Sequence, residues 1–277
     1  MRSGTPEETA SRVREILANF DINPQHLLDL LRTTRGIVSG SAALLMVTDM
    51  DFKPGDLDIY IPASQDQTAL LLVQRRLGYQ LKKSSARSYE NNADIKRVHL
   101  LTKGRNKIHV VTTEGENAAA TIFRFHSTIV MNLLTAWGIY CAYPSLTLKR
   151  KGVANLPTLL NDLSLSIRSR TCYEKYRSRG VTLENDVRKF PEHAAHICHA
   201  SAECPHTVRS TSDGKGLYVE LFNQPPHEVQ RQEMGEYTTV WMLGGPMCSS
   251  GNTFCTGFNK SLASIMKTVR VPATRSN

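Results

Sequence analysis

The sequence has few cysteines and no apolar N-terminal segment. Six cysteines in 277 residues are too few for the disulfide framework of a small secreted protein. The N-terminal stretch, MRSGTPEETASRVREI, is polar and charged, so it does not resemble a signal peptide. With 40% apolar and 21% charged residues, the composition excludes a collagen, a coiled coil and a disordered tail. We therefore expect a folded intracellular protein, cytoplasmic or nuclear, with reduced thiols.

A long apolar run that could cross a membrane is also missing. The stretch from Ser127 to Leu148 contains no Asp, Glu, Lys or Arg, but Asn132, Gly138 and Pro144 interrupt it. Several Ser and Thr residues lower its hydrophobicity further. We expect a buried helix in this stretch and no membrane contact.

Acidic residues are outnumbered, because 34 Lys+Arg stand against 25 Asp+Glu and give a formal net charge of +9. Two basic blocks carry the surplus: residues 75–107 have a local net charge of +8 and residues 149–190 of +6. Such blocks favour a polyanionic partner, RNA or a nucleoside triphosphate. The second block interleaves Tyr173 and Tyr176 with basic residues, a mixture that can stack bases. A solvated basic surface is the alternative.

The pattern of apolar residues, caps and turns predicts an α+β protein. We expect N-terminal helices in residues 1–35, a mixed-sheet core in residues 36–115, a helical segment packed on the core in residues 116–190 and a C-terminal extension with strands in residues 191–277. Helices are predicted at 6–20, 24–33, 42–47, 66–77, 117–140 and 156–179. Strands are predicted at 36–39, 56–61, from 81 onward, and at 95–102, 107–112, 218–222 and 239–243.

The most informative segment runs from Gly36 to Pro62. Gly40 and Ser41 lie where a short strand turns into a helix, and free backbone amides with a hydroxyl at such a place can bind a phosphate. Asp56 and Asp58 alternate with apolar residues on the next strand, so both carboxylates emerge on one face, about 6–7 Å apart. Paired carboxylates beside a phosphate-binding turn suit divalent-metal phosphoryl transfer.

This segment resembles the nucleotidyltransferase fold of DNA polymerase beta, the poly(A) polymerases and the aminoglycoside nucleotidyltransferases, including uncharacterised fungal proteins of this fold. The residues that carry the resemblance are Val38-Ser39-Gly40-Ser41 and Asp56-Leu57-Asp58-Ile59, within about residues 30–115. The resemblance implies that Gly40 and Ser41 hold the phosphates of a nucleoside triphosphate. It also implies that Asp56 and Asp58 bind Mg²⁺ or Mn²⁺ while a nucleotidyl group is transferred to a hydroxyl of RNA, a protein or a small molecule.

The sequence departs from the family pattern in two ways. Fourteen residues separate Ser41 from Asp56, a slightly long spacer, and the competing pair Asp49 and Asp51 is rejected because Lys53, Pro54 and Gly55 leave it no strand. The third carboxylate of active members is replaced by His109 in Lys107-Ile108-His109-Val110-Val111.

His109 leaves three interpretations open. An imidazole can substitute as a metal ligand, although it suits Zn²⁺ or Mn²⁺ better than Mg²⁺, or it can act as a general base. The first interpretation is an active nucleotidyltransferase with His109 in one of these roles. The second is a catalytically inactive protein of this fold that binds a nucleotide or a nucleic acid as an interaction module. The third is a structural protein without a ligand.

A further group of possible ligands lies near the C-terminal end. Four histidines and two cysteines occur between residues 193 and 206, and Cys248 and Cys255 follow. Cys198 and Cys204 are separated by five residues, so the C-x₂-C pair of common zinc sites is missing. Free thiols and surface histidines are therefore the simpler interpretation, with zinc as the alternative.

Overall fold

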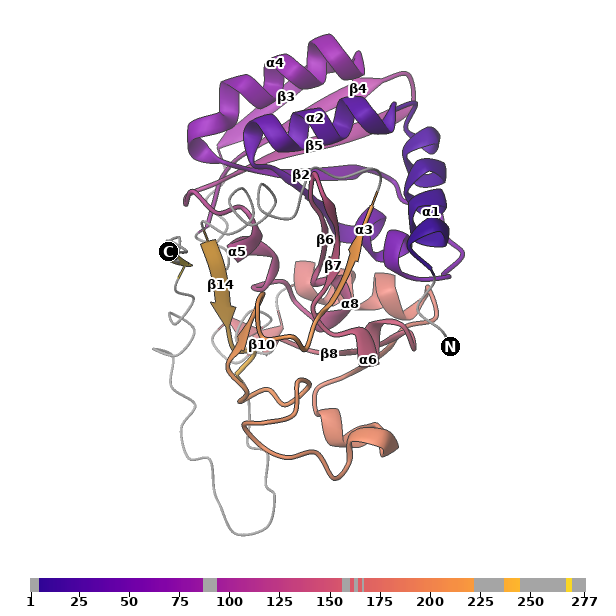
Figure 1. Cartoon of the computed structure of the whole chain (residues 1–277), viewed down its shortest axis with the longest axis vertical. Helices are drawn as coiled ribbons and strands as arrows, with labels where there is room; N and C mark the ends of the chain where they lie inside the picture. The colour runs from indigo at the N-terminus through magenta and orange to yellow at the C-terminus, as the bar shows by residue number, and fades with distance from the viewer. Residues whose placement is uncertain are drawn as a thin grey trace, which may run out of the picture. The chain divides into compact units, whose positions relative to one another are not determined.

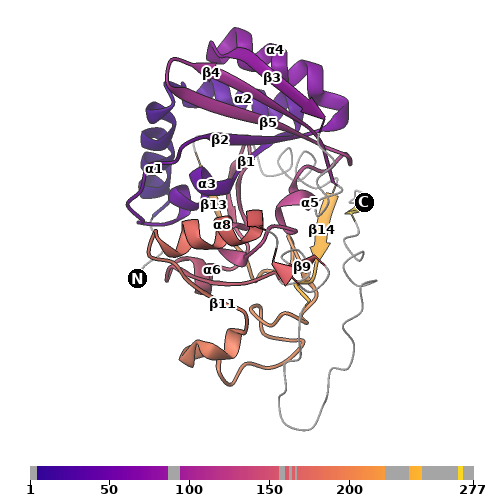
Figure 2. The ribbon, with the colours of Figure 1, turned by 180° about the vertical axis from the view of Figure 1, so that it is seen from behind.

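The computed structural model describes residues 5–86, 94–155, 160–161, 164–165, 167–221, 237–244 and 268–270. It confirms a mixed α+β fold, drawn from two sides in Figures 1 and 2. The chain divides into two compact units. Unit 1 comprises Met1–Ile122, Val130–Cys141 and Tyr218–Gln224, and unit 2 comprises Phe123–Ile129, Ala142–Leu217 and Pro225–Asn277. Unit 1 is therefore built from three segments that are far apart in the sequence, and its core forms when they pack together.

A mixed sheet of eight strands forms the centre of unit 1. Its strand order is β13-β7-β6-β1-β2-β5-β4-β3. β2 and β5 pair in parallel, whereas β1 pairs antiparallel with β2 and β6, and β4 pairs antiparallel with β3 and β5. The bounds are β1 (Ile37–Ser39), β2 (Leu57–Pro62), β3 (Gln80–Ala86), β4 (Ile95–Lys103), β5 (Asn106–Thr113), β6 (Asn132–Leu134), β7 (Gly138–Cys141) and β13 (Leu217–Glu220).

The helices of unit 1 begin and end where the sequence has capping residues. Thr5 and Glu8 form a capping box at the start of α1 (Pro6–Asn19), and the side chain of Asn23 caps α2 (Pro24–Thr34). Gly78, with φ 75°, ends α4 (Asp66–Leu77). The remaining helical segments are α3 (Gly40–Val47), η1 (Ala63–Gln65) and α5 (Ala119–Ile122). Figures 1 and 2 show α2 and α4 side by side over strands β3 to β5.

Helices α2 and α4 therefore cover one face of the sheet, and the strand register determines which side chains are buried on that face. Ile59 pairs with Val110, and both are fully buried, as are Leu57 and Ile108 two positions earlier. Because successive side chains on a strand point to opposite faces, Asp58 and His109 project on the other face.

The helical prediction for residues 117–140 is wrong. These residues form the short α5, a 3₁₀ turn η2 (Thr128–Val130) and the antiparallel strands β6 and β7. Thr135 closes the β6–β7 turn, because its hydroxyl accepts hydrogen bonds from the amides of Trp137 and Gly138. The stretch is mostly buried, as expected, but a continuously apolar segment does not distinguish a buried helix from buried strands.

The helix predicted at residues 156–179 is only partly correct. Within the described residues, this stretch contains the short strands β9 (Leu160–Asn161) and β10 (Ser164–Leu165), followed by α8 (Ile167–Arg177). Residues 156–159, 162–163 and 166 lie outside the described residues. The described helix in this range, α8, begins at Ile167.

Unit 2 is less regular, and of the two strands predicted after residue 191, one lies in unit 2 and the other in unit 1. The strand predicted at 239–243 is β14 (Tyr237–Trp241), which lies between β12 (Arg209–Ser210) and β15 (Thr268–Arg270). The strand predicted at 218–222 is β13, which joins the sheet of unit 1. The other elements are α6 (Pro144–Thr147), β8 (Lys151–Val153), β11 (Thr182–Glu184), η3 (Val187–Lys189) and η4 (Pro191–His193).

A buried arginine organises the core of unit 2. Arg209 is fully buried, and its guanidinium donates to Asp213 Oδ2 at 2.6 Å and to the carbonyl oxygen of Ala142 at 3.0 Å. It also lies over the rings of Tyr143 and Trp241, 4.8 and 5.2 Å from their centroids. These contacts satisfy a charge that would otherwise be costly to bury.

Among the described residues, no helix is both long enough and apolar enough to cross a membrane. The uncharged stretch at 127–148 contains only short elements, none of them such a helix.

Candidate metal and nucleotide site

The first component of the site is the junction of β1 and α3. Gly40 has φ +73°, a left-handed conformation that favours glycine. A Cβ atom on Gly40 would lie 2.6 Å from Asp58 Oδ2, closer than atoms can approach. The absence of a side chain at Gly40 therefore lets the Asp58 carboxylate lie directly against the start of α3.

The two serines at this junction are both buried. The hydroxyl of Ser39 donates to the carbonyl oxygen of Asn132 at 2.6 Å, so it does not cap α3. Ser41 is only 2% exposed. The sequence predicts that Gly40 and Ser41 hold phosphates. The structure places both residues at the helix start, with Gly40 more open to a ligand than Ser41.

The second component is a row of side chains across the sheet. Ser39 pairs with Asp58, Asp58 with His109, His109 with Leu100, and Leu100 with Lys83. Paired residues on neighbouring strands point to the same face. Strands β1, β2, β5, β4 and β3 therefore present one continuous row of side chains. The row begins at Ser39, beside the start of α3, and ends at Lys83 in the first basic block.

Asp58 and His109 of this row converge with Asp56, which precedes β2. His109 Nδ1 lies 3.1 Å from Asp58 Oδ1 and 3.6 Å from Asp56 Oδ2. One ligand atom from each of the three lies within 4.8 Å of the others. Their side chains are 23–33% exposed, so the group is accessible to a solute from solvent. The structure thus brings together the three residues named from the sequence as catalytic or metal-binding.

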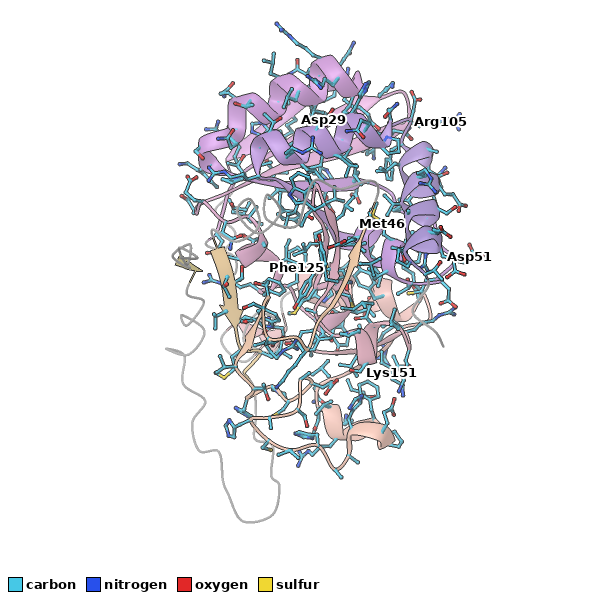
Figure 3. All side chains as sticks on the ribbon, in the orientation of Figure 1. Asp29, Met46, Asp51, Arg105, Phe125 and Lys151 are labelled. Carbon is cyan, nitrogen blue, oxygen red and sulfur yellow. The ribbon has the colours of Figure 1, made fainter. Side chains whose placement is uncertain are left out.

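Asp49 and Asp51 do not take part in this group. They lie in the irregular connection after α3, and no strand includes them. Figure 3 labels Asp51, which is exposed in this connection. The choice of Asp56 and Asp58 over this earlier pair is consistent with the strand assignment, because β2 begins only at Leu57.

Only part of the first basic block is available to a ligand. Arg97 pairs with Asp66 and Lys103 with Asp21, so these two cations stabilise the fold. Lys107 lies two positions before His109 on β5, and Lys83 ends the row, so both belong to the face of the carboxylates. Arg105 lies at the β4–β5 turn, as Figure 3 shows. Arg87 lies outside the described residues.

The second basic block does not present a base-stacking surface at Tyr176. This ring is buried, and the cationic groups of Lys175 and Arg179 each lie 5.5 Å from its centroid. The interleaving of rings and cations seen in the sequence is here a contact within unit 2.

A polar network on the covered face of the sheet was not predicted from the sequence. His99 is 2% exposed; its Nδ1 lies 2.8 Å from Ser84 Oγ, and its Nε2 lies 2.8 Å from Asp66 Oδ1. Thr112 also donates to Asp66 Oδ1, at 2.7 Å. Because Asp66 is the first residue of α4, the network fixes this helix on the sheet. No local motif indicates it, since its members come from four elements.

Comparison of the chain with protein-family models gives no match, and comparison with curated proteins gives none either.

Proposed function

We propose that unit 1 binds a nucleoside triphosphate with Mg²⁺ or Mn²⁺ and transfers its nucleotidyl group to a hydroxyl acceptor. The observation that carries the proposal is the convergence of Asp56, Asp58 and His109 beside the start of α3. The fold resemblance stated from the sequence supports the same assignment.

The donor set fits a divalent cation. Carboxylate oxygens are the ligands that Mg²⁺ and Mn²⁺ prefer, and Asp56 and Asp58 supply them from one face of the chain. The imidazole of His109 shifts the preference from Mg²⁺ towards Mn²⁺. Bound there, the metal would neutralise charge on the phosphates and orient them for in-line displacement.

The remaining residues bind and orient the nucleotide. The amides at the start of α3 offer hydrogen bonds to phosphate oxygens, because the Ser39 side chain does not cap the helix. Lys107 and Lys83 place positive charge on the same face, where it can interact with the triphosphate. His109 either completes the metal ligands or accepts the proton of the attacking hydroxyl.

A specific contact favours a second candidate function, a nucleotide- or RNA-binding module without catalysis. His109 Nδ1 lies within hydrogen-bond distance of Asp58 and close to Asp56. A protonated imidazole in this position would offset one of the two carboxylate charges and compete with a metal ion. Whether the protein is an enzyme or a binding module then depends on whether a metal ion can displace the proton from His109.

The test is incubation of the full chain with radiolabelled nucleoside triphosphates, Mg²⁺ or Mn²⁺, and RNA as the acceptor. We expect metal-dependent label transfer that Asp56→Asn and Asp58→Asn abolish, whereas Asp51→Asn, the matched control, leaves it unchanged. Transfer that persists in the first two variants would show that the site is elsewhere. If no transfer occurs but ATP still raises the melting temperature, the binding module is supported over the enzyme.

A further inference from the structure

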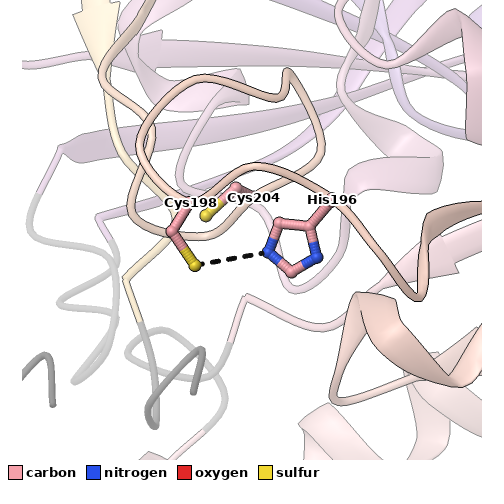
Figure 4. A group of neighbouring side chains, drawn as sticks. All are labelled: His196, Cys198 and Cys204. Carbon is pink, nitrogen blue, oxygen red and sulfur yellow. Dashed lines mark hydrogen bonds between the residues drawn. The ribbon is translucent and has the colours of Figure 1, made fainter. Parts of the chain in front are cut away.

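A loop in unit 2 brings together a second group of possible ligands, unrelated to the carboxylates of unit 1. His196, Cys198 and Cys204 each offer one ligand atom, and these atoms lie within 4.8 Å of one another. Figure 4 shows the imidazole and the two thiols beside each other. Cys198 Sγ lies 3.8 Å from His196 Nε2. A thiolate and an imidazole bound to the same tetrahedral zinc ion have their donor atoms about 3.6 Å apart, so only a small adjustment is needed.

The hydrogen bonds of His196 fix which ring nitrogen can bind a metal. Its Nδ1 lies 3.1 Å from the carbonyl oxygen of His193. A carbonyl oxygen only accepts hydrogen bonds, so Nδ1 carries the proton and the lone pair of the neutral ring is on Nε2. This is the atom that faces Cys198. A backbone carbonyl that orients the ring in this way is a recurrent partner of metal-bound histidines.

The loop has little apolar packing of its own. Ile197 is its one large apolar residue between positions 191 and 207, and it is 70% exposed. After η4, residues 194–208 contain turns rather than helices or strands. A segment of this kind resembles the small domains in which a metal ion supplies the stability that a core does not.

The rest of unit 2 nevertheless holds the loop in place. Arg209 Nη1 donates to the carbonyl oxygen of Ala202 at 3.1 Å, and the amide of Gly244 donates to that of Pro205 at 2.8 Å. Thr207 Oγ1 donates to the carbonyl oxygen of Ser201 at 2.7 Å. Cys204, between these anchors, is 1% exposed. Cys204 is therefore positioned before any ion binds, as is the His196 ring through the carbonyl oxygen of His193, which lowers the entropic cost of binding.

From this geometry we infer that His196, Cys198 and Cys204 supply three of the four ligands of a tetrahedral zinc ion. Two thiolates and an imidazole are soft ligands that select Zn²⁺ over Mg²⁺ or Mn²⁺. Binding releases the two thiol protons to solvent, so zinc affinity falls as the pH is lowered. The spacing His-x-Cys-x₅-Cys differs from common zinc motifs, which explains why the sequence favours free thiols over zinc.

The test uses the full chain, loaded with Zn²⁺, desalted and measured for bound metal. We expect about one zinc ion per chain in the wild type and near-complete loss in Cys198→Ser and Cys204→Ser. Cys172→Ser is the matched control, because Cys172 lies on α8 and outside the group. His199→Asn controls for the loop itself, since asparagine tolerates the φ of 62° at this position. The double variant Asp56→Asn/Asp58→Asn should retain the zinc.

A second measurement covers the case in which the cysteine variants do not fold. Co²⁺ added to the metal-free wild type should produce a thiolate-to-cobalt charge-transfer band and the intense visible bands of tetrahedral cobalt. Wild-type protein without bound zinc and without these bands would overturn the proposal, as would an equal zinc content in wild type and a folded Cys198→Ser variant.

Discussion

The Asp58 carboxylate occupies the space that a side chain on residue 40 would need, because a Cβ atom there would lie 2.6 Å from Asp58 Oδ2. The start of α3 and the Asp58 carboxylate on β2 can therefore approach each other because residue 40 is glycine. The proposed phosphate-binding and metal-binding groups consequently form a single site.

Gly40→Ala should both destabilise the protein and displace Asp58. The positive φ and the close contact together should lower the free energy of unfolding by roughly 2–3 kcal/mol. Gly104→Ala is the matched control, since Gly104 also has a positive φ (+57°), but a Cβ atom there would have no neighbour within 4 Å. Urea denaturation should show a loss of only about 1 kcal/mol for this control. Equal losses in both variants would mean that Asp58 does not require the glycine.

His109→Asp should raise the affinity for Mg²⁺ by restoring a third carboxylate, with an expected gain of about tenfold. Isothermal titration at neutral pH measures the effect. His99→Gln is the control histidine, because His99 lies on the opposite face of the sheet and contacts Ser84 and Asp66. His99→Gln should leave metal affinity unchanged at temperatures where the variant remains folded. An unchanged affinity in His109→Asp would place position 109 outside the metal site.

Lys107→Met should weaken ATP binding, since Lys107 lies on the face of the carboxylates. A loss of about 1 kcal/mol, or roughly fivefold in Kd, is expected for one charge contact with a phosphate. Arg105→Met removes the same charge from the β4–β5 turn and should have a smaller effect. Fluorescent-nucleotide titration at two salt concentrations separates the two variants; the same loss in both would indicate a diffuse attraction by net charge rather than a site.

Arg209→Met should unfold unit 2 at lower denaturant concentrations. The substitution removes the ion pair of the partly buried Asp213, which keeps hydrogen bonds from the amides of Ser210 and Lys215, and it removes the Arg209 donor to the carbonyl oxygen of Ala142. Removing one partner of a buried ion pair costs about 3–5 kcal/mol. Arg170→Met, at an exposed position on α8, should change stability by less than about 0.5 kcal/mol. The fluorescence of Trp241, which stacks on Phe123 with ring centroids 4.0 Å apart, provides a local probe.

His126 should make stability depend on pH. Burial, assisted by the charge of Lys175, lowers the pKa of His126 from 6.5 to about 4. Between these two values the unfolded chain binds a proton that the folded protein does not, so the free energy of unfolding decreases as the pH falls from about 6.5 to about 4. We expect a loss of about 2 kcal/mol, less than the full shift implies because the ring is not completely enclosed.

His126→Gln removes this titration and should flatten the dependence of stability on pH over that range. Thermal melts at pH values between 4 and 7 compare the variant with the wild type. If the two curves remain parallel, His126 is not the group responsible.

Much of unit 1 could be predicted from its sequence because its signals are local. Alternation identified β2, and the turn at residues 103–106 identified β4 and β5 as a hairpin. Acidic residues in the first turn identified α1, and the Asn23-Pro24 cap identified α2. The Gly-Ser turn identified the junction at residue 40. The resemblance to nucleotidyltransferases predicted His109 at the place of the third carboxylate, near Asp58. In the parallel β2–β5 register, His109 pairs with Asp58.

What could not be predicted depends on contacts between distant segments. β6 and β7 are strands because they extend the sheet from β1 and because β13 approaches Gly138, where a Cβ atom would lie 2.5 Å from the carbonyl oxygen of Val219. Nothing within residues 117–140 encodes these partners. The Asp66–His99 network and the orientation of His196 likewise arise from tertiary contacts and leave no periodic pattern in the sequence.

The central claim is that Asp56, Asp58 and His109 form a divalent-metal site, and Mn²⁺ binding tests it most directly. The EPR signal of free Mn²⁺ is titrated with the full chain in the presence of a non-hydrolysable ATP analogue. We expect binding by the wild type and by Cys198→Ser, and affinities at least about tenfold weaker for Asp56→Asn and Asp58→Asn. The same Mn²⁺ affinity in the wild type and in the Asp56→Asn/Asp58→Asn double variant would contradict the claim.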